Sequence, residues 1–239
     1  MYTYEVYIGA GQKIMTQIRE DSLINGEYYH IFSRSISKFV IFNNSREFAR
    51  MLEALTLYQF SNFDYKYSRY SDFDDKGKQL VWSKLLTSNS KLVEIAAYCL
   101  MPTHFHLILK QIQNDGISKY LSKVLNSYTR YFNLKHKRIG PLWSGRFKNV
   151  LIRKNDQILH LTRYIHLNPV SSGLVDNPKD WKFSSFGEYC EVPGSSQICF
   201  FHNLIDLSAD EYKKFVGDNI QHQLVLSKIK RLMIDDYTG

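Results

Sequence analysis

The chain has 239 residues, 44% of them hydrophobic and 15% aromatic, and its 31 Lys and Arg outnumber 23 Asp and Glu to give a formal net charge of +8. No run of 18 apolar residues and no signal-like N-terminus occurs, so we expect a soluble, cytoplasmic protein without a membrane partner. Three cysteines without a C-x-x-C pair argue against a disulfide scaffold or zinc finger, and the charge favours a polyanionic partner about as much as an uncommitted basic surface.

The N-terminal third is predicted to contribute two strands and a helix. Residues 27–42, EYYHIFSRSISKFVIF, are rich in β-branched and aromatic residues, which indicates strand, turn and strand. Asn44 and Glu47 resemble a capping box, and apolar residues then recur at helical spacing as far as about Tyr58. Residues 59–90 lose this period, and we expect an excursion with a short helix near its end.

Two further strands are predicted between residues 91 and 110, at the centre of the sheet. They are separated at Met101-Pro102, because proline cannot donate to a strand ladder. Gly140-Pro141 marks the end of the next helix, and a basic, aromatic loop and a strand follow it. That helix has an apolar stripe of Ile117, Tyr120, Leu121, Val124, Leu125, Tyr128 and Phe132.

A last core helix is predicted from about Asn155, as its N-cap, to Asn168, because Pro169 is expected to end it. A Pro/Gly/Ser-rich linker follows at residues 191–197, and two helical segments after it are predicted at 209–216, capped by Ser208, and at 222–234.

This order of elements predicts an α+β domain with an antiparallel sheet covered by helices. We assign residues 1–192 to this domain, with an excursion at about 59–90, and residues 193–239 to a linker and helical C-terminal extension.

Two histidines lie one residue apart in MPTHFHLILK, residues 101–110. Successive side chains of a strand point to opposite faces, so His104 and His106 share one face while Phe105 and Leu107 share the other. Such a pair can bind one metal ion, although taken alone it is more often incidental. Tyr164 and Asn168 lie four residues apart on the last core helix and therefore on one of its faces, where packing and capping are the simpler explanation.

Three segments in order carry a family resemblance, namely YCLMPTHFHLILK, NSYTRYFNLKHKRIGPLWSGRFKNVLI and LTRYIHLNPVSSGLVDNPKDWKFSSF. The chain resembles the single-tyrosine HUH transposases of bacterial insertion sequences, most closely the branch of REP-associated tyrosine transposases. The resemblance runs from about Tyr28 to Tyr189 and implies a ferredoxin-like sheet. It implies that His104 and His106 are metal ligands, that Tyr164 is the nucleophile and that Asn168 is the third ligand.

The resemblance implies a metal-dependent endonuclease and strand transferase for single-stranded or hairpin DNA, acting through a 5′-phosphotyrosine link. Mg²⁺ or Mn²⁺ fits two imidazoles and an amide oxygen. Tyr128 and Tyr131 compete for the role of nucleophile, but neither has an amide one turn later. For DNA binding we expect basic groups on phosphates and aromatic rings on unpaired bases, from Arg130, Arg138, Trp143, Arg146, Lys148 and Arg163, with Phe147 and Arg153 as further candidates.

Three alternatives stay open at this point. The chain could process host repeats without mobilising itself, bind nucleic acid as an inert relic, or hydrolyse DNA with water as nucleophile. A homodimer is equally open, as is whether Tyr164 serves its own subunit or a partner.

Overall fold

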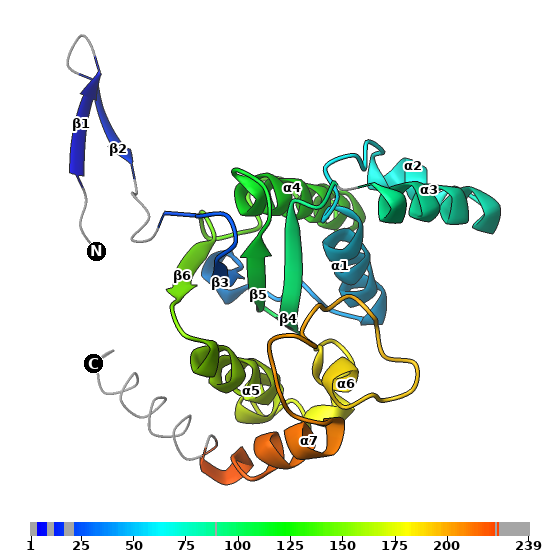
Figure 1. The fold of residues 1–239 in the computed structure, drawn as a ribbon. Coiled ribbons are helices and arrows are strands. Elements are labelled where there is room, and N and C mark those ends of the chain that lie inside the picture. Colours follow the sequence, from blue (N-terminus) through cyan, green and yellow to red (C-terminus); the bar gives the residue numbers. More distant parts are fainter. Residues whose placement is uncertain (1–3, 9–11, 17–21, 89, 223, 225–239) are drawn as a thin grey trace.

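A four-stranded antiparallel sheet forms the centre of the structure, a computed structural model that describes residues 4–8, 12–16, 22–88, 90–222 and 224 (Figure 1). The strand order is β4-β5-β3-β6. The strands are β3 (Tyr28–Arg34), β4 (Val93–Met101), β5 (His104–Gln111) and β6 (Lys148–Ile152). A separate two-stranded sheet pairs β1 (Tyr4–Ile8) with β2 (Gln12–Thr16). The predicted α+β architecture is therefore confirmed.

One face of the sheet is covered by α1 (Ser45–Leu57) and α4 (Gly116–Lys135). Alternation along β5 directs Phe105, Leu107 and Leu109 into this core, where all three are fully buried. The predicted apolar stripe of α4 packs onto the same core, except that Leu125 is only half-buried. This layer holds the largest hydrophobic cluster of the described residues.

The other face is covered by α5 (Asn155–Ser171), α6 (Phe186–Tyr189) and α7 (Ala209–Gly217). Here Cys99 of β4 and Ile108 of β5 pack against Ile165 of α5. Tyr212 and Val216 of α7 belong to the same cluster, so the predicted C-terminal helix packs as part of this layer. Ser208 caps α7 as expected, its hydroxyl accepting from the Glu211 N–H.

The excursion contains α2 (Tyr67–Ser71) and α3 (Asp75–Thr87), and α3 is longer than the predicted short helix. Figure 1 shows both helices projecting beyond α1 at one end of the molecule. Short 3-10 turns lie at Ile36–Lys38 and Pro178–Asp180. The predicted helix at 222–234 lies almost entirely outside the described residues.

The second strand predicted within residues 27–42 is wrong. Positive φ angles at Ser37 and Lys38 turn the chain after β3. The N–H groups of Ile41 and Phe42 then donate to the carbonyl oxygen of Pro102, in the turn between β4 and β5, at 2.9 and 3.2 Å. The residues that were predicted to form a second strand are therefore hydrogen-bonded to a turn and not to a neighbouring strand.

The prediction that both β4 and β5 are central is right only for β5. β4 is an edge strand whose outer side is hydrogen-bonded by later loops. The N–H of Phe200 donates to the Ile95 carbonyl at 2.8 Å, and that of Ser185 donates to the Tyr98 carbonyl at 2.9 Å. These loops bury β4, which explains why an edge strand is apolar at every position except Glu94.

Helix α5 does not end at Pro169. It begins at Asn155, so Lys154 precedes it as the N-cap, and it continues to Ser171. Gly173 follows the C-cap Ser172, and its φ of +70° is the left-handed conformation that terminates helices and suits glycine. The Asn168 carbonyl still accepts a hydrogen bond, from Ser172 at 3.0 Å. Asn168 is therefore an interior helix residue and not a terminal cap.

Among the described residues, no helix has the length and apolar character needed to cross a membrane.

Candidate active site at the sheet face beneath α5

His104 and His106 lie on the sheet face that α5 covers, and their rings meet at nearly right angles with centroids 5.2 Å apart. The other face of β5 is hydrophobic core, as predicted, and the two histidines share the face opposite to it. The register places His104 opposite Arg34 of β3, and His106 opposite Phe32.

Both histidines are held through their Nδ1 atoms. The Thr103 hydroxyl lies 3.0 Å from Nδ1 of His104, and Nε2 of His30 lies 3.0 Å from Nδ1 of His106. Within the part of the chain that the structure describes, neither Nε2 atom has a hydrogen-bond partner. This arrangement suits metal ligation, because a ligating imidazole binds through one nitrogen while a hydrogen bond at the other fixes the ring.

Tyr164 projects from α5 toward this pair. Its ring lies edge-on to His106 at a centroid distance of 5.9 Å and edge-on to His30 at 6.5 Å. Tyr164 is 37% exposed, so a substrate can reach it. The competing Tyr128 is fully buried in the other core, where its hydroxyl donates to the Ile41 carbonyl at 2.6 Å. Tyr131 packs against that same core, on the far side of the sheet.

Asn168 follows Tyr164 by one helical turn and is buried. Its side-chain nitrogen is buried without a hydrogen-bond partner. The oxygen and nitrogen of an amide are interchangeable by a flip, so the unpaired end could equally present the oxygen. Among the described residues no group of three His, Cys, Asp or Glu side chains could hold a metal ion. A metal at this face would therefore need the Asn168 amide beside the two histidines, and the unpaired amide fits that need.

Electrostatic surroundings favour neutral imidazoles at the site. Burial, with a smaller contribution from the charge of Arg34, lowers the pKa of His104 to about 4. Burial and, to a smaller extent, the neighbouring His30 hold the pKa of His106 well below its usual value. Burial raises the pKa of Tyr164, so its phenol keeps its proton at neutral pH.

Several basic residues lie near this face. Arg34 is exposed opposite His104, and Lys148 is exposed opposite Phe32, two strands away from His106. Arg163 precedes Tyr164 on α5, but its guanidinium lies over the Phe215 ring of α7 at 4.5 Å. Of the predicted DNA-binding set, Lys148 is thus best placed beside the histidines, and Arg34 was missed by the sequence analysis.

Two other members of that set, Arg138 and Trp143, make structural contacts. Arg138 donates to Asn133 and to the Pro141 carbonyl at 3.1 and 2.9 Å, which braces the loop after α4. Trp143 donates to Thr129 at 3.1 Å and packs against the core on the α4 side. Arg130 and Arg146 are exposed. Trp143 therefore offers less stacking surface than its position in a loop indicated.

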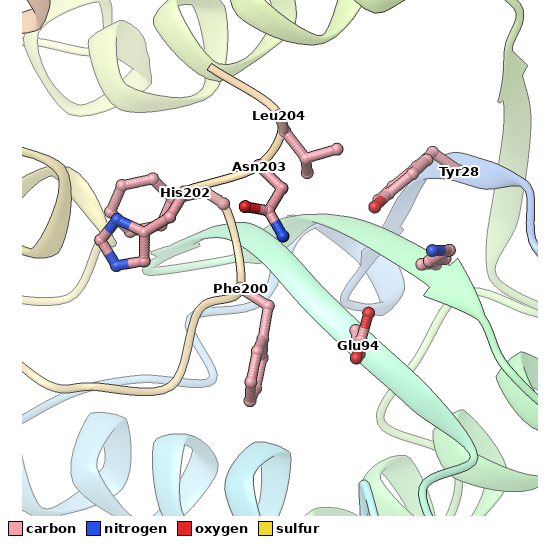
Figure 2. A pocket seen from close by; sticks show the side chains of 8 residues that line it. Tyr28, Glu94, Phe200, His202, Asn203 and Leu204 are labelled. Atoms are coloured by element: carbon pink, nitrogen blue, oxygen red, sulfur yellow. The ribbon is translucent and has the colours of Figure 1, made fainter. Parts of the chain in front are cut away.

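A pocket of about 240 Å³ lies on the same sheet face at the opposite strand ends (Figure 2). None of the predicted site residues lines it. Its lining consists of Tyr28, Glu94, Lys110, Phe200, Phe201, His202, Asn203 and Leu204.

His30 was missed from the sequence. Alternation in YYHIFSR puts it on one face of a strand, but a lone histidine carries little signal. Its importance depends on the pairing of β3 with β5, which joins residues 76 positions apart.

Comparisons with known proteins show which proteins the chain resembles. Residues 65–168 match the family model described as transposase, IS200-like, a range that includes all four residues of the candidate site. The REP-associated tyrosine transposase of Escherichia coli K12 is 32% identical over 94 residues, which cover 39% of this chain and 54% of that protein. A Haemophilus influenzae protein assigned to the same group is 32% identical over 103 residues, which cover 39% of this chain and 58% of its own.

A solved structure of a REP-associated tyrosine transposase bound to a REP hairpin has the same fold, with a TM-score of 0.52 and 20% identity. The alignment covers 82% of this chain and 96% of that one. The chain thus spans a little over half the length of the two curated relatives that it matches in sequence. Its fold similarity to the solved structure extends over most of both chains. Its resemblance to the IS200-like transposases, and among them to REP-associated tyrosine transposases, is therefore confirmed.

Proposed function

We propose that this protein is a metal-dependent endonuclease and strand transferase for single-stranded or hairpin DNA. The observation that carries the proposal is the meeting of two elements: Tyr164 of α5 lies edge-on to His106 of β5 at 5.9 Å, with Asn168 one turn further along the helix. These residues are the same set that the family resemblance assigns to catalysis.

In the proposed reaction the Tyr164 oxygen attacks the phosphorus of a DNA phosphodiester. The bond between phosphorus and the 3′-oxygen breaks as the bond to the tyrosine oxygen forms. The leaving 3′-oxygen takes up the proton that the phenol releases, so the products are a 5′-phosphotyrosine and a free 3′-hydroxyl. A second 3′-hydroxyl then reverses the exchange and reseals DNA, because the phosphotyrosine link conserves the energy of the original bond.

His104, His106 and Asn168 would hold a divalent ion, Mg²⁺ or Mn²⁺, in this proposal. When bound, such an ion polarises a phosphate oxygen and orients the phosphodiester for in-line attack. The protein itself orients the groups: Thr103 and His30 hold the rings of His104 and His106, and α5 positions Tyr164 beside His106. Proton removal from Tyr164 has to accompany attack, since burial raises its pKa.

The DNA substrate is proposed from charge and from the relatives. Arg34 and Lys148 flank the histidines on the open part of the face, where each could contact a backbone phosphate. A solved relative is bound to a REP hairpin, and a hairpin with single-stranded flanks is the substrate class we infer here.

The test is a denaturing gel of purified protein with Mn²⁺ and end-labelled oligonucleotides that tile the DNA flanking its gene. We expect cleavage and a protein–DNA adduct for wild type, neither of them for Tyr164→Phe, and loss of both when EDTA is added. Tyr131→Phe is the matched control, because it removes a tyrosine hydroxyl on the far side of the sheet.

Other outcomes point to other functions. Cleavage that persists in Tyr164→Phe without an adduct would contradict the tyrosine mechanism and indicate water as nucleophile. Tight DNA binding without cleavage on any strand would indicate a binding protein that retains only the fold.

A further inference from the structure

His30 contacts the candidate metal site without being one of its predicted ligands. It lies on β3, which pairs with β5, and its side chain is on the same sheet face as that of His106. Its Nε2 is 3.0 Å from Nδ1 of His106, on the side of that ring away from the nitrogen left for ligation.

The two rings are arranged end to end. Their centroids are 5.2 Å apart and their planes differ by 20°. This separation is close to the nitrogen–nitrogen distance of 3.0 Å plus the radii of the two rings, so the two nitrogens face each other along their lone-pair directions. The contact therefore has the alignment of a true hydrogen bond and not of a stacked pair.

Only one hydrogen fits between the two nitrogens of neutral rings. If His106 carries it on Nδ1, its Nε2 has a lone pair available to a metal ion. If His30 carries it on Nε2, His106 must carry its own hydrogen on Nε2 and cannot bind a metal there. The partner of Nδ1 thus decides whether His106 is a ligand.

We propose that His30 is a positioning residue that accepts a hydrogen bond from His106 and so selects the tautomer able to bind a divalent cation. The inference rests on the proposed function, because it assumes that His106 is a ligand. His30 is not itself an additional ligand through Nε2, since that atom faces His106. Phe32, whose ring centroid lies 5.2 Å from that of His30, helps to fix its orientation.

The test uses Mn²⁺ alone as the probe, with free Mn²⁺ measured by electron paramagnetic resonance on the full chain without DNA. We expect His30→Leu to bind Mn²⁺ about 10–100-fold more weakly, the usual loss when an outer partner of a ligating histidine is removed. His30→Gln should keep most of the affinity, because its amide oxygen reaches the position of the histidine Nε2. His30→Asn should lose it, because its amide is one carbon shorter.

The control is His202→Leu, which removes an exposed histidine that is not part of the site and should bind as wild type does. Circular dichroism and the urea midpoint establish that each variant is folded. If His30→Leu does not fold, the comparison of His30→Gln with His30→Asn still tests the inference.

Equal affinity for wild type, His30→Leu and His30→Asn would overturn the inference while leaving the metal site standing. A wild-type protein that binds no Mn²⁺ would overturn the proposed function and this inference with it.

Discussion

Asn168 is a buried amide on α5 whose side-chain nitrogen has no hydrogen-bond partner. An unpaired buried polar group costs about 1–3 kcal/mol of stability, so a residue kept only for packing would be apolar here. The amide makes sense if a ligand pairs with it in the working protein. Stability and function should therefore respond to its replacement in opposite directions.

We predict that Asn168→Leu, which keeps the number and branching of the side-chain heavy atoms, raises the free energy of unfolding of the metal-free protein by about 1 kcal/mol. The same change should abolish Mn²⁺ binding and DNA cleavage. Urea denaturation in EDTA measures the first effect and Mn²⁺ titration the second. Asn126→Leu, at an exposed position of α4, controls for the change in helix propensity. A loss of stability at 168 equal to that of other core variants would contradict the assignment.

Glu47 is also a buried polar residue, but unlike Asn168 it has partners that explain its burial. Its carboxylate is fully buried, and one oxygen lies 2.7 Å from both Lys135 Nζ and His136 Nε2. The other oxygen accepts from the Asn43 backbone N–H at 2.7 Å. Burial alone would raise the pKa of Glu47, but these hydrogen bonds outweigh it and lower the pKa to about 2.

A pKa lowered on folding makes stability depend on pH in one direction. The charged Glu47 stabilises the fold above the unfolded pKa of about 4.5, and this stabilisation is lost as the pH falls toward 2. We predict that wild type loses roughly 1–3 kcal/mol more than Glu47→Gln between pH 5 and pH 2.5, a range that allows for the partly exposed partners. Urea unfolding at each pH measures the stability of both proteins. Equal losses of stability in wild type and Glu47→Gln would contradict the prediction.

At the scale of elements, α5 is fixed to its neighbours by a buried histidine. His166 is fully buried, with Nδ1 2.7 Å from the Tyr212 hydroxyl of α7 and Nε2 2.8 Å from the Ser185 hydroxyl. Ser185 also accepts from the Tyr98 N–H of β4 at 2.9 Å. This chain of hydrogen bonds ties the helix that carries Tyr164 to α7 and to the sheet.

Tyr212→Phe should therefore leave one nitrogen of His166 unpaired in the core. We expect a loss of about 1–3 kcal/mol in the free energy of unfolding. In a double-mutant cycle, Tyr212→Phe should cost much less when His166 is already leucine, because the two residues act together. Tyr65→Phe, at an exposed site, should be neutral. Additive losses in the cycle would indicate that the two residues stabilise the protein independently.

The sequence predicts elements well where one periodicity decides them. The alternation at the start of β5 and the long stripe of α4 were recognisable because each follows a local rule over several residues. Errors occurred where distant segments decided the outcome. Ile41 and Phe42 donate to the Pro102 carbonyl, which lies in the turn between β4 and β5, and β4 is covered by loops that follow it by about 85 to 105 positions.

The candidate site shows the same division. His104 with His106, and Tyr164 with Asn168, are local pairs whose spacing fixes a shared face, so their residues could be named from sequence. Their approach to one another depends on how α5 crosses the sheet, which only the family resemblance indicated. Arg34 and His30 reach the site through the register of β3 with β5, and no local pattern encodes that register.

At the scale of the whole molecule, the structure shows where some of the basic residues behind the net charge of +8 lie. Arg34 and Lys148 are exposed on the site face, whereas Arg138 and Arg163 are engaged with a loop and with α7. Positive charge that serves DNA should therefore be concentrated beside the histidines.

We predict that Arg34→Ala and Lys148→Ala each weaken binding of single-stranded DNA and each reduce the slope of log K against log salt by about 0.7, the value for one phosphate contact. Fluorescence anisotropy over a salt series measures both quantities. Lys76→Ala, on α3 in the excursion, removes an exposed charge elsewhere and should change the slope little. Equal effects from all three variants would indicate a diffuse charge effect instead of a path along this face.

The most direct test of the account is the identity of the residue that carries DNA during the reaction. Wild-type protein would be incubated with Mn²⁺ and the cleaved oligonucleotide, trimmed with nuclease, digested with protease and analysed by mass spectrometry. The account predicts a nucleotide attached through a 5′-phosphate to the peptide that contains Tyr164. Attachment to another residue, or efficient cleavage with no modified peptide, would contradict it.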